Sequence, residues 1–164
     1  MLRFTHHFEL LNPDGSLARA WEVPNLIPQV GVDYIAKAIF GDTAAIGTFY
    51  MGLYQGNYTP TPPTTAADLP VNAQEFLQYS EATRPLWNRT YDGVGAISNI
   101  NNRAEFTCTQ NARLYGGFLV SSNVKGGSTG LLLSIARFDT PADVTAGQTL
   151  RAYSTINLIP AEVA

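Results

Sequence analysis

The chain has 164 residues, of which 45% are hydrophobic and 14% are charged, and its formal net charge is −3. This length fits one domain with its own core, and a charged fraction well below the roughly 25% of an average globular protein favours a surface partly covered by other subunits. The ten Lys and Arg residues are scattered and form no basic stripe, which argues against an electrostatic nucleic-acid binder.

Residues 2–23 show the pattern of a β-hairpin. Apolar and polar residues alternate over 2–10, which is the period of a strand with one buried face. The sequence Asn-Pro-Asp-Gly at 12–15 follows as a turn, because proline sets φ for the bend and glycine accepts a positive φ. The segment 17–23 then returns as the second strand.

A single long helix is predicted at residues 29–40. Its apolar residues recur at helical spacing, and charged residues fall on the other face. Pro28 stands at the expected start of the helix and Gly41 just past its expected end, which are the positions these residues favour.

A strand at 48–55 is followed by a proline-rich segment at 56–70. Four prolines among threonines and alanines argue against a central strand there and favour an extended loop or arm. Loops of this length in compact domains are usually functional or lie at interfaces. Residues 71–80 fit either a short strand or one helical turn. Two weaker strands follow at 83–88, where a proline favours a sheet edge, and at 94–100.

The strongest β pattern lies in the second half of the chain. Alternation at 104–108 and 114–120 predicts two half-buried strands, and the apolar run 131–138 predicts a strand buried on both faces. A loop is expected at 140–147, before a final strand at 149–159. The residues of that strand expected to point inward are Leu150, Ala152, Ile156 and Leu158.

The complete pattern is that of a mainly β protein with an N-terminal hairpin and one short α-helix. Strands at regular spacing, separated by turn residues, predict an antiparallel, jelly-roll-like β-sandwich over 48–160 rather than βαβ units. We expect a single domain, 1–164, with the hairpin and helix at 1–41 attached to the sandwich.

Few side chains suggest catalysis or metal binding. His6 and His7 are neighbours on a strand, so they point to opposite faces and cannot share a metal ion; we expect His6 to be partly buried and His7 solvated. Cys108, the only cysteine, alternates inward with core residues and excludes an intrachain disulfide. The glycine-rich stretch 125–130 lacks the spacing of a phosphate loop and is typical of a hairpin turn. These patterns predict a protein that is not an enzyme and holds no cofactor or metal.

Two further expectations concern location and hydrolysis. The N-terminal residues lack the apolar core of a signal peptide, and no apolar stretch is long enough to span a membrane, which favours folding in a reducing cytoplasm without membrane contact. A glycosidase needs two carboxylates at a set spatial separation, and spacing along the sequence leaves that possibility open.

Aromatic residues gather in the middle of the chain, beside the proline-rich segment. Tyr and Trp are favoured where one end of the ring is buried and the other is wet, as at interfaces. Ordinary packing inside the sandwich and stacking on carbohydrate are alternative interpretations. The candidate interface residues are Tyr54, Tyr58, Pro60, Pro62, Pro63, Trp87 and Tyr91.

Several short stretches of the sequence, taken together and in chain order, are similar to segments of a known class of proteins. Residues 21–27 (WEVPNLI), followed by Gly-Val-Asp at 31–33, combine the exit of a hairpin with the entry of a helix, and residues 48–54 (TFYMGLY) form the first sandwich strand. Further stretches of this kind are 115–122 (YGGFLVSS), 136–138 (ARF) and 146–150 (AGQTL). In combination they resemble small structural proteins of tailed bacteriophage particles.

The resemblance implies a virion component without catalytic activity. It implies a capsid cement, or decoration, protein that is made in the host cytoplasm, binds the outside of the shell as a homo-oligomer (dimer or trimer) and bridges neighbouring major capsid subunits. The expected partners are the major capsid protein or other virion proteins. The alternative is a small tail or fibre component that contacts host surface glycans.

Overall fold

The computed structural model describes residues 2–158 and has two antiparallel β-sheets packed face to face, which confirms the predicted β-sandwich with an N-terminal hairpin. The long helix occupies the predicted residues, and a second helix has only four residues. The elements are β1 (Leu2–Leu11), β2 (Leu17–Pro24), α1 (Gln29–Phe40), β3 (Tyr50–Tyr54), α2 (Asp68–Val71), β4 (Thr90–Tyr91), β5 (Ala96–Ser98), β6 (Ala104–Thr107), β7 (Ala112–Val120), β8 (Leu132–Val144) and β9 (Thr149–Leu158).

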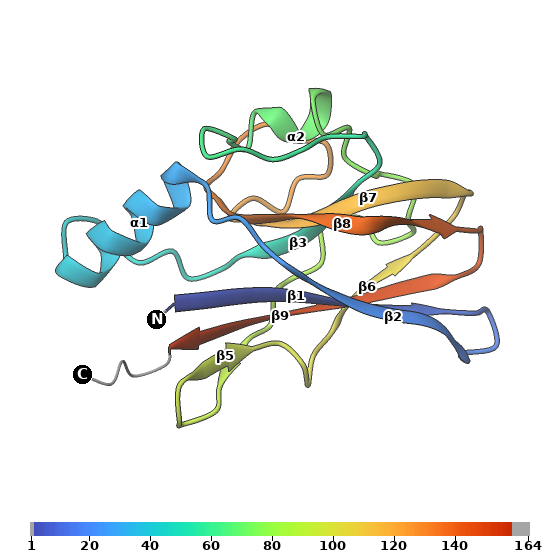
Figure 1. Ribbon diagram of the computed structural model, residues 1–164, viewed down its shortest axis with the longest axis horizontal. Helices are drawn as coiled ribbons and strands as arrows, with labels where there is room; N and C mark the ends of the chain where they lie inside the picture. Colours follow the sequence, from blue (N-terminus) through green and yellow to red (C-terminus); the bar gives the residue numbers. More distant parts are fainter. Residues whose placement is uncertain (1, 159–164) are drawn as a thin grey trace.

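The larger sheet has six strands and the smaller has three (Figure 1). The order in the six-stranded sheet is β2-β1-β9-β5-β4, with β6 also paired to β9, and the order in the three-stranded sheet is β3-β7-β8. Strands β1 and β9 pair along their whole length, from Leu2 opposite Leu158 to Leu11 opposite Thr149. The main core fills the space between the two sheets, with Phe8, Phe106 and Leu119 among its fully buried side chains.

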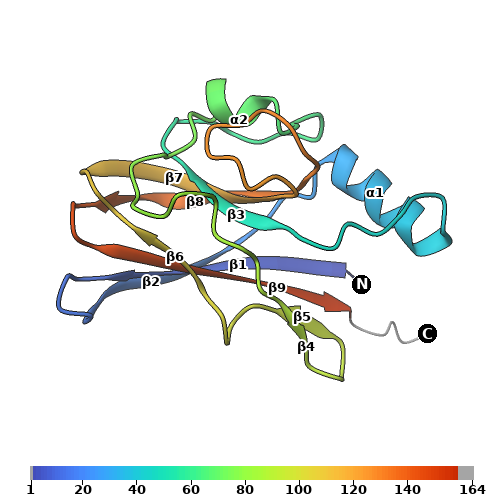
Figure 2. The ribbon, with the colours of Figure 1, turned by 180° about the vertical axis from the view of Figure 1, so that it is seen from behind.

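A third layer covers the outer face of the three-stranded sheet. Figure 2 shows α2 and the segments around it lying over β7 and β8. Ala66 and Leu69 of this layer pack with Tyr54, Phe118 and Ile135 of the sheet to form a second core. Strand β8 is therefore covered on both faces, as its apolar run predicted.

The proline-rich segment 56–70 belongs to this third layer and lies against the body of the protein. Arg137 on β8 donates hydrogen bonds to the Tyr58 carbonyl at 2.7 Å and to Oδ1 of Asn57 at 2.6 Å, and the backbone N–H of Gln29 donates to the Pro62 carbonyl. The proline-rich segment is therefore a loop that packs on the protein, and not an extended arm.

Two glycines allow the aromatic side chains of this second core to pack on the sheet. A Cβ added at Gly52 would lie 2.1 Å from the Phe118 ring, and one added at Gly116 would lie 2.3 Å from the Tyr54 ring and 2.1 Å from the Ala136 carbonyl oxygen. Both aromatic rings therefore occupy space that any other residue at these glycines would fill.

Three expectations about individual strands and residues after residue 80 are wrong. Strand β8 continues through Thr140 and Pro141 to Val144, where we expected a loop; it is an edge strand of its sheet, where proline loses no ladder hydrogen bond. Leu158 is 52% exposed because β9 extends past the end of the core. Segment 83–88 forms only an isolated bridge, between Leu86 and Tyr50.

Segment 71–80 forms no strand or new helical turn of its own. The short helix α2 ends at Val71, and the residues after it make isolated bridges, from Glu75 to Tyr54 and from Tyr79 to Cys108. These bridges link the free side of β3 to the residues that follow β6, so the segment closes one side of the sandwich.

Candidate interaction surface

Two of the predicted interface residues are core residues. Tyr54 is fully buried, and its hydroxyl donates to the Ala136 carbonyl at 3.1 Å. Trp87 is buried, and its Nε1 donates to the Ser154 carbonyl at 3.2 Å. The interpretation of these two side chains as partner contacts is wrong, because their polar atoms bond within the protein and their rings are covered.

The other five predicted residues do not form one surface. Pro62 and Pro63 are exposed on the outer layer, and Pro60 and Tyr58 beside them are half-buried, with the Tyr58 hydroxyl 2.9 Å from Oγ1 of Thr64. Tyr91 is exposed on β4, at the edge of the six-stranded sheet. The three-stranded sheet lies between β4, which carries Tyr91, and the layer around α2 that contains the proline-rich segment (Figure 2).

The buried histidine is a structural residue. His6 is fully buried between two serine hydroxyls, with Nε2 2.5 Å from Ser134 Oγ and Nδ1 2.5 Å from Ser154 Oγ. Burial, with a smaller contribution from the charge of His7, lowers the pKa of His6 to about 3. The ring is neutral at pH 7, and it is more deeply buried than the sequence predicted.

The only cysteine and the glycine-rich turn also have structural roles. Burial raises the pKa of the Cys108 thiol to about 11, so the thiol stays protonated and is a poor nucleophile. The turn at 125–130 is tied down by the buried pair Arg84–Glu75: Glu75 accepts from the Gly126 N–H at 2.9 Å, and Arg84 donates to the Gly127 carbonyl at 2.9 Å. The hairpin-turn interpretation is confirmed.

This buried ion pair has no signal in the sequence, because the positions of Arg84 and Glu75 look like those of solvated charges. Arg84 makes two parallel hydrogen bonds to the carboxylate, at 2.8 and 2.7 Å, and a third to the Ser122 carbonyl. Such paired geometry is what allows two charges to be buried together.

Within residues 2–158, no group of three or more His, Cys, Asp or Glu side chains is placed to hold a metal ion. No helix in that part of the chain is long and apolar enough to cross a membrane.

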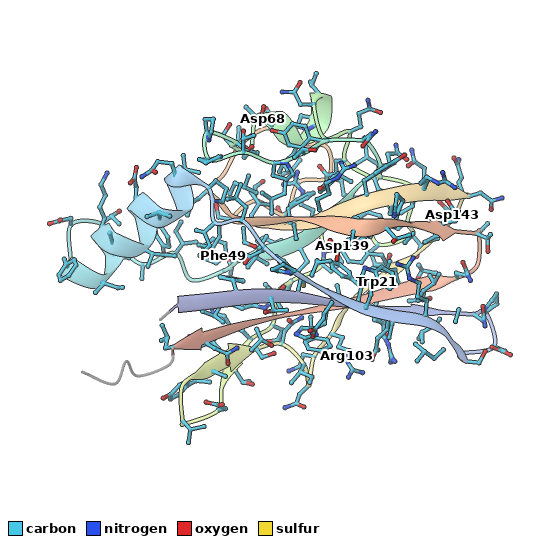
Figure 3. All side chains as sticks on the ribbon, in the orientation of Figure 1. Trp21, Phe49, Asp68, Arg103, Asp139 and Asp143 are labelled. Atoms are coloured by element: carbon cyan, nitrogen blue, oxygen red, sulfur yellow. The ribbon has the colours of Figure 1, made fainter. Side chains whose placement is uncertain are left out.

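An apolar pocket of about 300 Å³ opens at one end of the sandwich. It lies between α1 and the ends of β1, β5 and β9, and Figure 3 shows Phe49 in the core on that side. The helix contributes Tyr34 and Ile35, and the sheet contributes Ile97 and Ile156. Most of the residues that line the pocket are apolar.

Arg89 is the charged residue that lines this pocket. Its Nη1 donates to the Gly47 carbonyl at 3.2 Å, and its guanidinium carbon lies 5.2 Å from the centre of the Trp87 ring. Among the described residues it has no acidic partner within ion-pair distance. The rim of the pocket therefore carries one positive charge that no carboxylate neutralises.

Exposed apolar side chains line the pocket or lie close in sequence to residues at the same end of the sandwich. Ile39 and Leu158 line it, Phe40 beside Ile39 is 81% exposed, and Val94 is 86% exposed. Val94 precedes Gly95, whose carbonyl accepts a hydrogen bond from the Leu158 N–H at 2.8 Å. Figure 1 places α1, β5 and the end of β9 at one end of the molecule. We call these four side chains and the pocket the apolar end.

A second, polar surface lies on the outer face of the six-stranded sheet. His7 stacks on Tyr153, with ring centres 4.3 Å apart and planes 5° apart, and its Nδ1 is 3.2 Å from Glu22. Arg103 lies on this face, while Trp21 lies on the opposite side, between the sheets (Figure 3). A shallow pocket of about 250 Å³ beside His7 and Tyr153 also includes Glu9.

No protein-family model matches the chain, and no curated protein matches its sequence.

Proposed function

We propose that this chain is a non-enzymatic structural protein of a tailed bacteriophage virion, and specifically a cement protein that binds the outside of the capsid and bridges major capsid subunits. The resemblance of the short stretches along the chain supports the phage assignment. The apolar end supports a role in assembly, because exposed apolar side chains that lie at the same end of a protein as an apolar pocket can mark an interaction site.

The observation that carries the proposal is that Phe40 and Val94, which are 81% and 86% exposed, lie at the same end of the sandwich as an apolar pocket. Interface centres are depleted in charge and enriched in aromatic and apolar residues, as this surface is. The low charged fraction of the sequence agrees with a protein that works inside a larger assembly.

The placement of the reactive groups favours a structural role over catalysis. His6 bonds to both Ser134 and Ser154 in the core, and the Cys108 thiol is buried with a raised pKa. None of these groups lines the pocket beside His7 and Tyr153 or the pocket at the apolar end.

The test is to compare purified particles with and without this protein. We expect shells that lack it to release DNA at a lower temperature, and added purified protein to restore the heat resistance. The Phe40→Asp variant should fail to restore it, whereas Val124→Asp, at an exposed apolar residue away from the apolar end, should succeed. Particles that withstand heating equally well without the protein, and do not bind it, would contradict the cement role.

A second candidate is a small tail or fibre component that contacts host glycans. The shallow pocket beside His7 and Tyr153 favours it, because aromatic rings next to carboxylates are suited to sugar binding. Trp87 is buried and is not the stacking residue. On a glycan array we expect binding that is lost in Tyr153→Ala and kept in Tyr91→Ala; an array without any bound glycan removes this candidate.

A further inference from the structure

The apolar end carries a projection and a hole side by side. Phe40 is the last residue of α1 and its side chain is exposed to solvent, while the neighbouring Ile39 lines the pocket. A surface that bears both can pair with a copy of itself, since a twofold axis brings each projection to the other copy's hole.

The pocket is large enough for the projection. A cavity of about 150 Å³ lined by aliphatic and aromatic side chains already holds a benzene ring. The pocket at the apolar end is about 300 Å³, so the Phe40 ring of a second copy fits, with room for part of Ile39.

The charges around the two features are complementary. Asp42, two residues after Phe40, is exposed, and among the described residues it forms no ion pair. Arg89 at the rim of the pocket also has none. In a twofold dimer with Phe40 of one copy in the pocket of the other, we expect Asp42, two residues after Phe40, to face Arg89 at the rim of that pocket. A symmetric interface would contain this contact twice.

A second copy accounts for more of the surface than a small apolar ligand does. A ligand in the pocket would leave Phe40 and Val94 exposed and Asp42 and Arg89 without partners. A twofold contact covers the pocket, the projection and both charges at once.

We propose that two copies of this chain form a dimer through the apolar end, with Phe40 of each copy in the pocket of the other and Asp42 facing Arg89. The inference deepens the proposed function, since it makes the dimer the unit that binds the shell. It leaves the proline-rich segment and the outer face of the six-stranded sheet open to capsid subunits.

The first test measures the mass of the purified protein in solution over a series of concentrations, by light scattering and sedimentation. We expect a dimer for the wild type and for Val124→Asp. Phe40→Asp should raise the dissociation constant about thirtyfold or more, as loss of a central aromatic contact does. Circular dichroism should show that Phe40→Asp folds, because the side chain is exposed in the single chain.

The second test reverses the charges. Asp42→Arg and Arg89→Asp should each weaken the dimer, and the double variant should recover it, because the pair is restored with opposite polarity. If Arg89→Asp disturbs the packing on Trp87, the weaker dimer expected for Asp42→Arg alone still tests the charge pair.

Three results would overturn the dimer. One is a wild-type protein that stays monomeric at every concentration. Another is a dimer that Phe40→Asp and Asp42→Arg leave unchanged. The third is a monomer whose pocket binds a hydrophobic dye only after residues 159–164 are removed, or that carries a small apolar adduct in native mass spectrometry. A monomer that still binds shells contradicts only the dimer, and a dimer that binds no shells contradicts only the cement role.

Discussion

Polar side chains in the interior of this protein connect parts of the fold that are distant in sequence. His6 lies opposite Ser154 across the β1–β9 pair and reaches Ser134 in the other sheet. Asn25 adds a hydrogen bond to the same Ser134 hydroxyl at 2.6 Å. Buried polar groups are costly unless they are paired, so this chain of bonds favours one register of β1 and one position of the two sheets.

The buried histidine predicts that stability falls in mild acid. The pKa of His6 is lowered to about 3 in the folded protein, from 6.5 in the unfolded chain, so below pH 6.5 the unfolded chain binds a proton that the folded protein does not. The free energy of unfolding should fall by about 1.4 kcal/mol for each pH unit between 6.5 and 3 from this residue. Unfolding by urea at pH 7.5 and pH 5 measures it.

His6→Gln removes the titrating group and should flatten this pH dependence, whereas His7→Gln on the outer face should keep most of it. Proton NMR gives a direct check, since the His6 ring should not titrate between pH 7.5 and 4.5 while the protein stays folded. A His6 resonance with a midpoint near pH 6.5 in the folded protein would contradict the assignment.

Strands of the three-stranded sheet combine glycines with aromatic residues so that both faces can be covered. Phe118 packs over Gly52 on the neighbouring strand, and Tyr54 packs over Gly116. A register shift between β7 and β8 at Val120 turns both Leu133 and Ser134 toward the main core. These local features allow one short sheet to serve two cores.

Gly116→Ala should destabilise the protein strongly. The added methyl group would overlap the Tyr54 ring and the Ala136 carbonyl, and overpacking of a tight core typically costs about 1–3 kcal/mol. Gly47→Ala is the matched control, because nothing lies within 4 Å of the position of its Cβ, and it should have little effect. The measurement is the melting temperature of both variants in thermal unfolding. Equal melting temperatures would contradict the prediction and show that the sheet relaxes around the added methyl group at position 116.

The sequence predicts the elements well and the interaction surface poorly. The hairpin, the helix and the strands of the second half all show a clear period of burial, and each is present. Tyr54 is wrongly predicted to be at the surface because residues on both faces of a doubly covered sheet look alike in sequence, and Trp87 because it lies in an irregular segment that shows no period of burial. Phe40 carried a usable signal, since it falls off the apolar stripe of α1 directly before the glycine that ends the helix.

The complete sandwich depends on its last described strand. β9 pairs with β1, β5 and β6 and contributes Leu150 and Ala152 to the core. Pairing of Leu2 with Leu158 also makes the fold rich in contacts between distant residues, which is typical of slowly folding β proteins.

A chain that ends at Gln148 should therefore not fold. It lacks the strand between β1 and β5, so β1 and β2 remain as a two-stranded ribbon, which is marginally stable in water. The near-ultraviolet circular dichroism signal and the cooperative thermal transition should both be lost, whereas a chain that ends at Leu158 should keep them. A cooperative transition in the shorter chain would contradict this role of β9.

The pairing of β1 with β9 has a consequence for synthesis on the ribosome. The β1–β2 ribbon emerges before the other described strands, but the second neighbour of β1, which is β9, is translated only after almost all the rest of the described chain. During that time one edge of β1 offers unpaired backbone groups to other nascent chains, and open strand edges are a main route to aggregation. We expect the yield of soluble protein to depend on translation speed and on chaperones more than the stability of the finished sandwich suggests.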